Sequence, residues 1–506
     1  MTRFYQRLIA AALACCAVSS GEICEDASAI ANDSTTPLGS TNVVQSSTAS
    51  AASAGSNSST KCFSTDFLFG SATASYQVEG AVNATGRTPS IWNEICGSDS
   101  FPSCANVADD YFHRYKDDIA TMKNDGYGSM RFLISWSRVM TWNSTLERMQ
   151  PNPEGLAFYH SMVDDLVASG IEPLLTLFHW DMPIELYDAG DFLNTTIIDH
   201  FLDYAELIFS EFGQQVKFWS TINEPLSLDS ERCKNWSCAL GLPYNESNEA
   251  DVEAAERYSE FHTGWFLSPL TTGDYPAMMR ERVGDRLPNF TDDQAALVKG
   301  SYDLLMINHY FANLMTDCDS EHSQTNCSSL SAGFHADICV DSSQMPPEAV
   351  VGTGSIADPT SCTDHSGFPP SYLKYIRWTH KFDTSSDILL TENGWCGNET
   401  IDNQDQLWYF RTHMEMVHKA IYDENIPIIG YTAWSFVDNY EWGSYAPRYG
   451  LYHVDFPDNI GDRDVFEVPS GYLIRTPRAT VKWYANLATT GCFETDADDE
   501  KWLAYV

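Results

Sequence analysis

Basic side chains are scarce in this chain of 506 residues, where 29 Lys and Arg stand against 70 Asp and Glu and give a formal net charge of -41. A surface this acidic repels the phosphates of nucleic acids and of anionic lipid headgroups. We therefore expect neither a nucleic-acid partner nor an anionic membrane partner, and the charge suits a soluble secreted protein.

Long apolar runs are missing as well, because no stretch approaches the roughly 20 consecutive apolar residues that a membrane-spanning helix needs. The apolar run at residues 8–18 is too short to be a membrane anchor. Because Arg3 and Arg7 precede it, residues 1–20 have the layout of a signal peptide. Residues 491–506 are predicted to be an acidic tail, with no lipid-anchor signal and no retention signal. The sequence thus predicts a protein that is secreted, or kept in the lumen of the secretory pathway, with no membrane anchor.

No cysteine spacing is typical of a zinc site, so no metal is expected. Cys15 and Cys16 belong to the predicted signal peptide, and the other twelve cysteines indicate partial disulfide pairing in an oxidising compartment. Buried free thiols are the alternative. Ten sequons for N-glycosylation fit the secretory route, at Asn32, Asn57, Asn83, Asn143, Asn194, Asn235, Asn245, Asn289, Asn326 and Asn398.

The organisation of the chain changes near residue 60. Residues 21–60 are rich in Ser, Thr and Ala with almost no large apolar side chain, which predicts a disordered linker. From residue 61 to residue 490, apolar strand candidates alternate with amphipathic helices, which predicts an α/β fold, a (β/α)8 TIM barrel. Seven strand ends can be marked, near Ala74, Trp136, Trp180, Glu224, Tyr310, Glu392 and Phe436. The fold requires eight strands.

Two of these strands end in a single carboxylate. The apolar residues 388–390 lead to Glu392, and residues 218–222 lead to Glu224. The carboxyl ends of parallel barrel strands carry functional side chains, and a pair of carboxylates there is what glycoside hydrolysis needs. The simpler alternative is that each is one acid among 70 in a very acidic chain.

At this point the sequence resembles the family 1 glycoside hydrolases, which include β-glucosidases, lactases and plant myrosinases. The resemblance rests on separate motifs spread over most of the chain. They are residues 67–80 (FLFGSATASYQVEG), 131–138 (RFLISWSR), 176–181 (TLFHWD), 221–225 (TINEP), 308–310 (NHY), 391–395 (TENGW) and 434–442 (WSFVDNYEW). The family implies a catalytic barrel that retains the anomeric configuration and needs no metal or organic cofactor.

The resemblance assigns the chemistry residue by residue. It implies that Glu224 is the acid/base and Glu392 the nucleophile, with Arg131, Tyr310 and Asn308 supporting the nucleophile. A nucleophilic carboxylate must stay ionised, which a neighbouring cation and hydrogen-bond donors favour. For Arg131 the alternative is a salt bridge that only holds strands together.

The same motifs imply a set of sugar-binding residues. Hydrogen bonds to the sugar hydroxyls and an aromatic surface under its ring are expected from Gln77, His179, Trp180, Asn223, Trp434, Glu441 and Trp442. Taken singly, His179 and Trp434 would more often be core residues, and their common placement at strand ends favours the site. The resemblance also implies a local disulfide between Cys233 and Cys238.

Two residues narrow the range of substrates to be expected. The myrosinase branch has a Gln where this chain has Glu224, and the phospho-sugar enzymes of the family have a Ser where it has Glu441, so neither substrate class is favoured. The expected substrates are small glycosides or oligosaccharides with a terminal unphosphorylated β-D-glucoside, and β-galactosides or β-fucosides as side substrates. No Trp stands between Ser320 and Pro370, where the family often has an aglycone platform, so aglycone preference is not carried over.

One departure from the family pattern affects the whole barrel. Between Glu224 and Asn308 lie 84 residues (308 − 224), and a helix is predicted over residues 251–265, but residues 226–248 hold no β-branched run of strand length. The fourth helix and fifth strand look deleted, so we expect a barrel that lacks the fifth strand or is distorted there. An error in the gene model or a skipped exon, and a true deletion that the protein tolerates, both stay open.

The sequence therefore leaves three alternative functions open. The first is a secreted retaining β-glucosidase. The second is a non-catalytic sugar-binding remnant, or an inactive splice or gene-model variant, which the deletion would produce by moving Glu224 relative to Glu392. The third is transglycosylation to alcohol acceptors in place of water.

Overall fold

The computed structural model describes residues 59–225, 240–325, 333–354, 358, 361–363, 365–495 and 497–506. The predicted signal peptide, residues 21–58 of the predicted linker and the implied Cys233–Cys238 pair lie outside the described residues.

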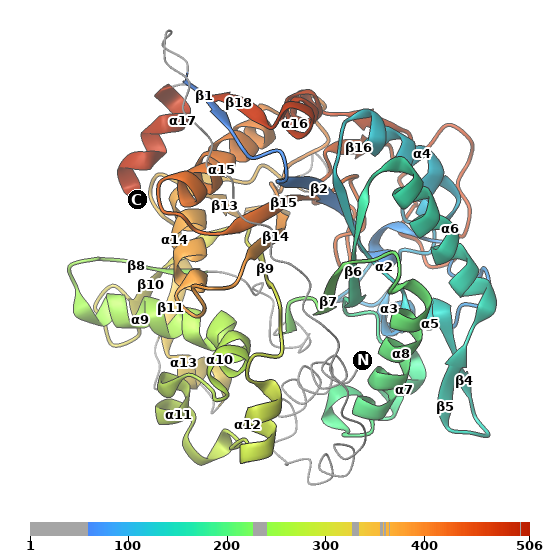
Figure 1. Cartoon of the computed structure of the whole chain (residues 1–506), viewed down its shortest axis with the longest axis horizontal. Helices are drawn as coiled ribbons and strands as arrows, with labels where there is room; N and C mark the ends of the chain where they lie inside the picture. Colours follow the sequence, from blue (N-terminus) through green and yellow to red (C-terminus); the bar gives the residue numbers. More distant parts are fainter. Residues whose placement is uncertain are drawn as a thin grey trace.

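Seven parallel strands form the central sheet (Figure 1). In spatial order they are β7 (Phe218–Ile222), β6 (Glu172–Phe178), β3 (Ser129–Leu133), β2 (Leu68–Ala72), β15 (Ile428–Trp434), β14 (Ile388–Asn393) and β9 (Leu305–Asn308). The first and last in the chain, β2 and β15, are direct neighbours, so the sheet curls back on itself as a barrel does. The predicted TIM-barrel class and the seven predicted strands are confirmed.

Helices cover the outside of this sheet (Figure 1). The long ones are α4 (Tyr111–Asn124), α6 (Pro153–Ser169), α8 (Ile197–Phe212), α14 (Pro369–His380), α15 (Gln404–Tyr422) and α16 (Ala479–Thr490). Helix α8 shows why they pack there, because its buried residues recur every three or four positions and form one apolar stripe. Helix α6 has Pro153 in its first turn and ends at Gly170 with φ 77°, the residues that favour a helix start and stop.

Shorter elements lie in the loops at the strand ends. The helices among them are α2 (Ser75–Val78), α3 (Ile91–Ile95), α5 (Trp136–Val139) and α7 (Ile184–Asp188). The paired strands are β4 (Met140–Asn143) with β5 (Arg148–Pro151), β12 (Val350–Val351) with β13 (Ser366–Gly367), and β16 (Tyr452–Val454) with β17 (Arg475–Pro477).

Among the described residues, the central sheet has a break between β7 and β9, where the fifth strand of a barrel would lie. Within the described ranges no strand pairs with β7 on one side of the break or with β9 on the other. All five residues of β7 are half-buried, whereas every residue of β3 and β14 is buried. The described residues agree with the expected barrel that lacks its fifth strand or is distorted there, and the strand beside the break, β7, is more exposed than β3 and β14.

A strand does form in the window where none was predicted. β8 (Leu240–Pro243) pairs in parallel with β10 (Ala312–Asp317), which also pairs with β11 (Val340–Gln344). Burial of Leu240 and Leu242 stabilises it, and Gly241 lets it approach helix α9 (Glu249–Ser259) so closely that a Cβ would lie 2.6 Å from the Ala255 carbonyl oxygen. β8 contains no β-branched residue, so packing rather than local β propensity makes this strand, and the sequence did not predict it.

The chain between β8 and β9, together with β10 and helix α13 after it, builds a second small core beside the barrel (Figure 1). Its helices are α9 (Glu249–Ser259), a π-helical turn at Glu260–Gly264, α10 (Trp265–Thr272), α11 (Ala277–Val283), α12 (Asp292–Val298) and α13 (Phe334–Ile338). The predicted helix at residues 251–265 is confirmed as α9 and the turn that follows it.

The two ends of the described chain meet at the amino-terminal side of the barrel. β1 (Ser59–Cys62) pairs with β18 (Cys492–Thr495), and a disulfide joins Cys62 to Cys492. Beyond β18 follow α17 (Ala497–Glu500) and a 3-10 helix at Lys501–Tyr505, whose Trp502 packs on Trp408 of α15. The segment predicted as an acidic tail thus contains these elements.

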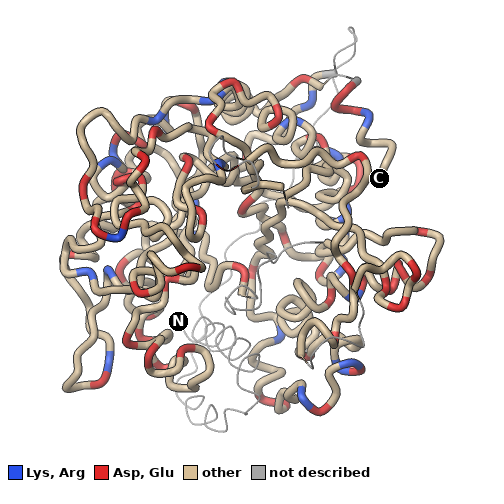
Figure 2. The backbone as a smooth tube through the Cα atoms, turned by 180° about the vertical axis from the view of Figure 1, so that it is seen from behind, with Lys and Arg blue, Asp and Glu red and all other residues tan. Residues whose placement is uncertain are grey.

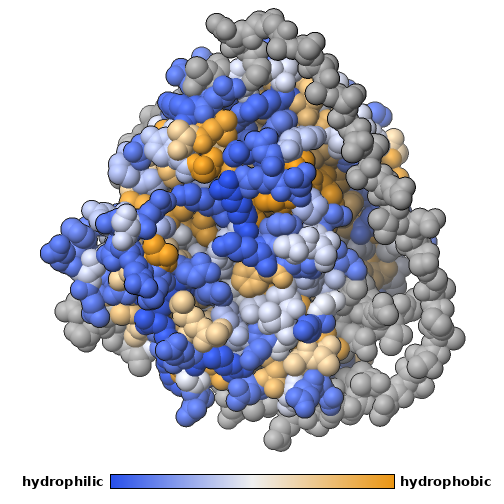
Figure 3. Space-filling model, turned by 60° about the vertical axis from the view of Figure 1, so that its left-hand side comes forward, coloured by the Kyte–Doolittle hydropathy of each residue, from blue (hydrophilic) through white to orange (hydrophobic). Residues whose placement is uncertain are grey.

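The surface shows the charge imbalance of the sequence. Acidic positions outnumber basic ones along the backbone (Figure 2), and hydrophilic residues cover most of the face in Figure 3, with small apolar areas between them. Among the described residues, no helix is both long and apolar enough to cross a membrane.

Candidate active site

The predicted site residues gather at the carboxyl ends of the barrel strands. Glu392 is the next-to-last residue of β14, and Asn308 is the last residue of β9. Arg131 lies in β3, and Glu224 follows β7. Adjacent parallel strands bring their ends to one rim of a barrel, so residues far apart in sequence meet there.

Glu392 is buried and is held from two sides. The Arg131 guanidinium donates to its Oε1, and the Tyr310 hydroxyl donates to its Oε2 at 2.7 Å. Burial and the charge of Glu392 raise the pKa of Tyr310 well above its ordinary value, so its hydroxyl stays protonated and can donate. Both carboxylate oxygens of Glu392 are therefore fixed in direction.

Asn223 connects the two carboxylates. Its Oδ1 accepts from Arg131 Nη2 at 2.8 Å and from Asn308 Nδ2 at 3.1 Å. The same Asn308 amide donates to Glu224 Oε1 at 2.8 Å. The Thr391 hydroxyl donates to Asn308 Oδ1 at 2.7 Å, which turns the NH2 group of this amide towards Glu224.

Glu224 has a constrained backbone, with φ 43° in the left-handed region. A non-glycine residue costs free energy there and persists only where the surrounding structure holds it, as it commonly does at functional sites. Glu224 directly follows Asn223, so the turn that strains its backbone also carries its side chain to Asn308.

His179 is neutral. Burial, with a smaller contribution from Arg131, holds the pKa of His179 well below its ordinary value. Its Nε2 lies 3.0 Å from Asn223 Nδ2 and accepts from that amide, which places the ring proton on Nδ1. In this tautomer Nδ1 is the donor atom of the His179 ring.

Glu441 forms a second cluster with Gln77 and Trp434. Gln77 Nε2 donates to one oxygen of Glu441 at 3.1 Å, and Trp434 Nε1 donates to the other at 3.2 Å. Burial raises the pKa of Glu441 well above its ordinary value, against the opposing effect of the Trp434 hydrogen bond. This carboxyl is thus oriented by two donors and can hydrogen-bond to hydroxyl groups.

Aromatic rings line the site next to these clusters. Trp442 lies 4.6 Å from Trp180 and 5.6 Å from the His179 ring, and His179 lies 6.2 Å from Trp434, measured between ring centroids. Trp180 and Trp442 both have positive φ, 70° and 46°. The strained backbone at both positions turns these rings towards one another, as an aromatic surface for a sugar ring requires.

Sequence reasoning missed Trp92 of helix α3. Its ring centroid lies 4.7 Å from that of Trp442, and its Nε1 donates to the Trp180 carbonyl at 2.8 Å. The only available signal was an aromatic residue two positions after Ser90, which caps α3. Trp92 supports the aromatic surface from behind.

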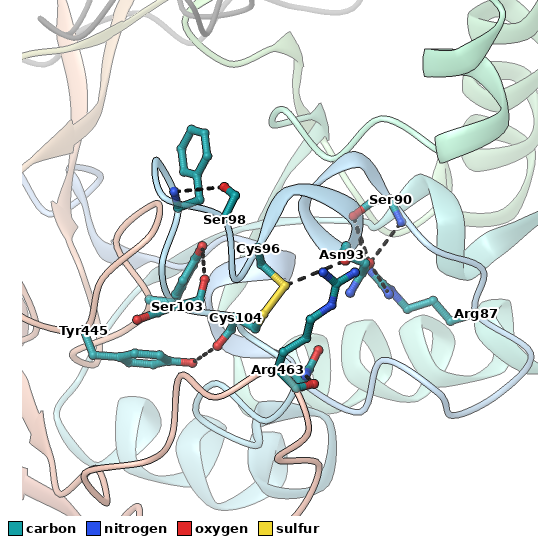
Figure 4. The surroundings of a disulfide bond; sticks show 12 residues. Arg87, Ser90, Asn93, Cys96, Ser98, Ser103, Cys104, Tyr445 and Arg463 are labelled. Atoms are coloured by element: carbon teal, nitrogen blue, oxygen red, sulfur yellow. Dashed lines mark hydrogen bonds between the residues drawn. A yellow bond between two sulfur atoms is a disulfide. The ribbon is translucent and has the colours of Figure 1, made fainter.

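A disulfide loop follows helix α3, and Figure 4 shows its surroundings. Cys96 and Cys104 close a short loop after α3, and Tyr445 Oη donates to the Cys104 carbonyl at 3.1 Å. The Ser103 N–H donates to the Gly443 carbonyl at 3.2 Å. The loop is thereby fastened to the segment that carries Glu441 and Trp442.

The structure brings all twelve predicted site residues into one connected network of hydrogen bonds and ring contacts. These are Gln77, Arg131, His179, Trp180, Asn223, Glu224, Asn308, Tyr310, Glu392, Trp434, Glu441 and Trp442. Within the described part of the chain, no group of three or more His, Cys, Asp or Glu residues is placed to hold a metal ion.

Comparison with known proteins identifies the family. The model of glycosyl hydrolase family 1 matches residues 59–235 and 233–492. The chain belongs to this family. The two matches meet at residues 233–235, in the segment where the sequence lacks the fourth helix and fifth strand of the pattern.

Relatives agree with this assignment. The chain is 32% identical to raucaffricine-O-β-D-glucosidase of Rauvolfia serpentina, over 79% of this chain and 88% of that one, and 31% identical to β-glucosidase 30 of Arabidopsis thaliana, over 83% and 81%. A rice β-glucosidase mutant in a covalent complex with Glc superimposes with a TM-score of 0.72 at 29% identity, covering 84% of this chain and 98% of that one. An aphid myrosinase gives the same TM-score at 28% identity, covering 85% and 99%. This glycosyl hydrolase thus cleaves O-glycosidic bonds.

Proposed function

We propose that this family 1 enzyme is a secreted retaining β-glucosidase that hydrolyses terminal, unphosphorylated β-D-glucosides by double displacement. β-Galactosides and β-fucosides are its side substrates. The observation that carries the proposal is the pair of carboxylates, Glu392 held by Arg131 and Tyr310, and Glu224 linked to them through Asn308 and Asn223.

The first displacement breaks the bond between the anomeric carbon and the aglycone oxygen. Glu392 attacks the anomeric carbon while Glu224 gives its proton to the leaving oxygen. Arg131 and Tyr310 donate to the two oxygens of the attacking carboxylate and hold it in place. The product is a glycosyl ester on Glu392 and a free aglycone.

The second displacement releases the sugar. Glu224, now deprotonated, takes a proton from water, and the oxygen of that water attacks the anomeric carbon. The ester bond breaks and Glu392 regains its charge beside Arg131. Two inversions leave the β configuration of the substrate in the product. The similarity to a rice β-glucosidase mutant in covalent complex with Glc supports this route.

The residues of the network support a neutral sugar. Arg131 is the single cation among the twelve, and it is paired with Glu392, while His179 is neutral. A phosphate bound beside Glu441 would lie against a carboxyl whose oxygens already accept hydrogen bonds from Gln77 and Trp434. Since the one cation of the network is paired with Glu392, none of the twelve residues would neutralise the charge of the phosphate.

Secretion rests on chemistry of the cysteines as well as on the predicted signal peptide. Disulfides among the described residues include Cys62–Cys492, Cys96–Cys104 and Cys362–Cys396, and Cys318 and Cys339 are disulfide-bonded as well. Disulfides persist in oxidising compartments. Amino-terminal sequencing of protein recovered from the medium should begin after residue 20, and retention of the full-length protein inside the cell would contradict secretion.

Two matched variants test the catalytic assignment. Glu392→Gln should abolish hydrolysis of every aryl β-glucoside, while binding of glucose stays nearly unchanged. Glu224→Gln should lose activity mainly on poor leaving groups, and added azide should restore turnover as β-glucosyl azide, because a small anion needs no general base. A wild type that binds glucose but hydrolyses no aryl glucoside would instead mark a sugar-binding remnant, which the break between β7 and β9 among the described residues would explain.

A further inference from the structure

A second disulfide lies directly beside the nucleophile strand. Cys396 comes four residues after Glu392 (396 − 392), and Cys362 lies in the segment between β12 and β13, which follows β9. Both cysteines are fully buried. The bond therefore joins the loops that follow two neighbouring barrel strands, on the face of the barrel that carries the site.

This disulfide belongs to a small buried cluster that also contains site residues. Cys362 and Cys396 share the cluster with Trp434 and Tyr449, and Tyr310 packs against it. Tyr310 donates to Glu392, and Trp434 donates to Glu441. The cluster thus lies behind one residue that holds the nucleophile and another that holds a sugar-binding carboxyl.

On one side, the path from the disulfide to these residues runs through Tyr449. Gly397, next to Cys396, exchanges two backbone hydrogen bonds with Arg448, at 3.0 and 3.3 Å. The neighbouring Tyr449 places its ring edge against the Tyr310 ring, 5.8 Å between centroids. Its carbonyl accepts from the N–H of Ser435, the residue after Trp434, at 3.3 Å.

On the other side, the path runs through His365. Its N–H donates to the Cys362 carbonyl at 3.0 Å. Its ring lies 5.1 Å from Phe311, the residue after Tyr310, and 6.0 Å from Tyr449. Both halves of the disulfide therefore lead to Tyr449, and each reaches the chain around Tyr310.

We propose that the Cys362–Cys396 disulfide is a positioning element of the active site, which acts through Tyr449 and His365 to hold Tyr310 on Glu392 and Trp434 on Glu441. The inference rests on the nucleophilic role proposed for Glu392. Catalytic groups work only within a fraction of an ångström of their productive positions, and the residues behind them supply that precision. The covalent bond supplies it here because it ties the segment that carries Cys362, which also contains the short β12–β13 pairing, to the residues that follow Glu392.

The test compares two disulfides of the same chain. Cys362→Ala/Cys396→Ala removes the bond behind the site, and Cys62→Ala/Cys492→Ala removes the bond between β1 and β18 at the opposite end of the barrel. The measured quantity is the rate constant for labelling of Glu392 by an activated 2-deoxy-2-fluoro-β-glucoside, with kcat and KM for an aryl β-glucoside. We expect labelling and kcat to fall about 10-fold or more in the first variant, with a smaller change in KM, and to stay within about twofold in the second.

A second variant covers a failure of the first to fold. His365→Ala keeps the disulfide and removes the ring between Phe311 and Tyr449, and we expect labelling about threefold slower. Labelling at the wild-type rate in the folded cysteine variant, or in His365→Ala if that alone folds, overturns the inference. A wild type that is never labelled refutes the proposed function and this inference with it, whereas a labelled wild type with equally labelled variants overturns the inference alone.

Discussion

Replacing Tyr310 with Phe isolates a single hydrogen bond at the proposed nucleophile. The change removes the donor 2.7 Å from Glu392 Oε2 and keeps the ring that packs against Tyr449. A hydrogen bond to a charged group contributes about 1.5–3 kcal/mol. At about 1.4 kcal/mol for each factor of ten, its full loss in the transition state predicts a fall in kcat/KM of about 10- to 150-fold.

Steady-state kinetics on an aryl β-glucoside, together with the rate of labelling by a 2-deoxy-2-fluoro-β-glucoside, measure this effect. Tyr484→Phe is the control, because it also removes a buried phenol donor, to the Gly70 carbonyl at 2.7 Å, without touching either carboxylate. Both variants should lose some thermal stability, and Tyr310→Phe alone should lose activity. A change in kcat/KM of less than about threefold in Tyr310→Phe would refute the claim that this hydrogen bond orients the nucleophile.

Three further outcomes are expected. Cys62→Ser/Cys492→Ser removes a disulfide between residues 430 positions apart and should lower Tm by roughly 3–6 °C in a thermal scan. An unchanged Tm would show that the β1–β18 pairing holds the two ends together without the disulfide. Burial raises the pKa of Asp181 to about 7, so its folded pKa exceeds its unfolded pKa and stability is lost as pH rises between about 4 and 7. Asp181→Asn should therefore gain Tm relative to wild type between pH 5 and pH 8, and a difference that does not depend on pH would contradict this. Trp442→Ala should raise KM for glucosides about 10-fold through lost stacking, and an unchanged KM would remove Trp442 from the sugar surface.

Much of the barrel could be predicted from the sequence because parallel strands buried on both faces read as apolar runs. The strand before Glu392 is the clearest case, since Ile388, Leu389 and Leu390 are all fully buried in β14. Barrel topology then places the residues after each run on one rim. For this reason Arg131 and Glu392, 261 positions apart, could be expected to meet, and they do.

The remainder depends on packing that no local pattern encodes. β8 consists of two leucines, a glycine and a proline, and its pairing with β10 follows from the close approach of Gly241 to helix α9. The Cys62–Cys492 bond could not be paired from sequence, because the spacing of cysteines says nothing about which strands meet. Trp92 carries no chemical signal of its own, and only its contacts with Trp180 and Trp442 reveal its role.

The central claim is that Glu392 works as a nucleophile although the described barrel strands leave a break between β7 and β9. Intact mass measurement and peptide mapping of the purified protein, after exposure to an activated 2-deoxy-2-fluoro-β-glucoside, test it most directly. We predict one added sugar per chain, on Glu392, and none in Glu392→Gln. Folded, soluble protein that acquires no adduct, or acquires it on another residue, would contradict the account.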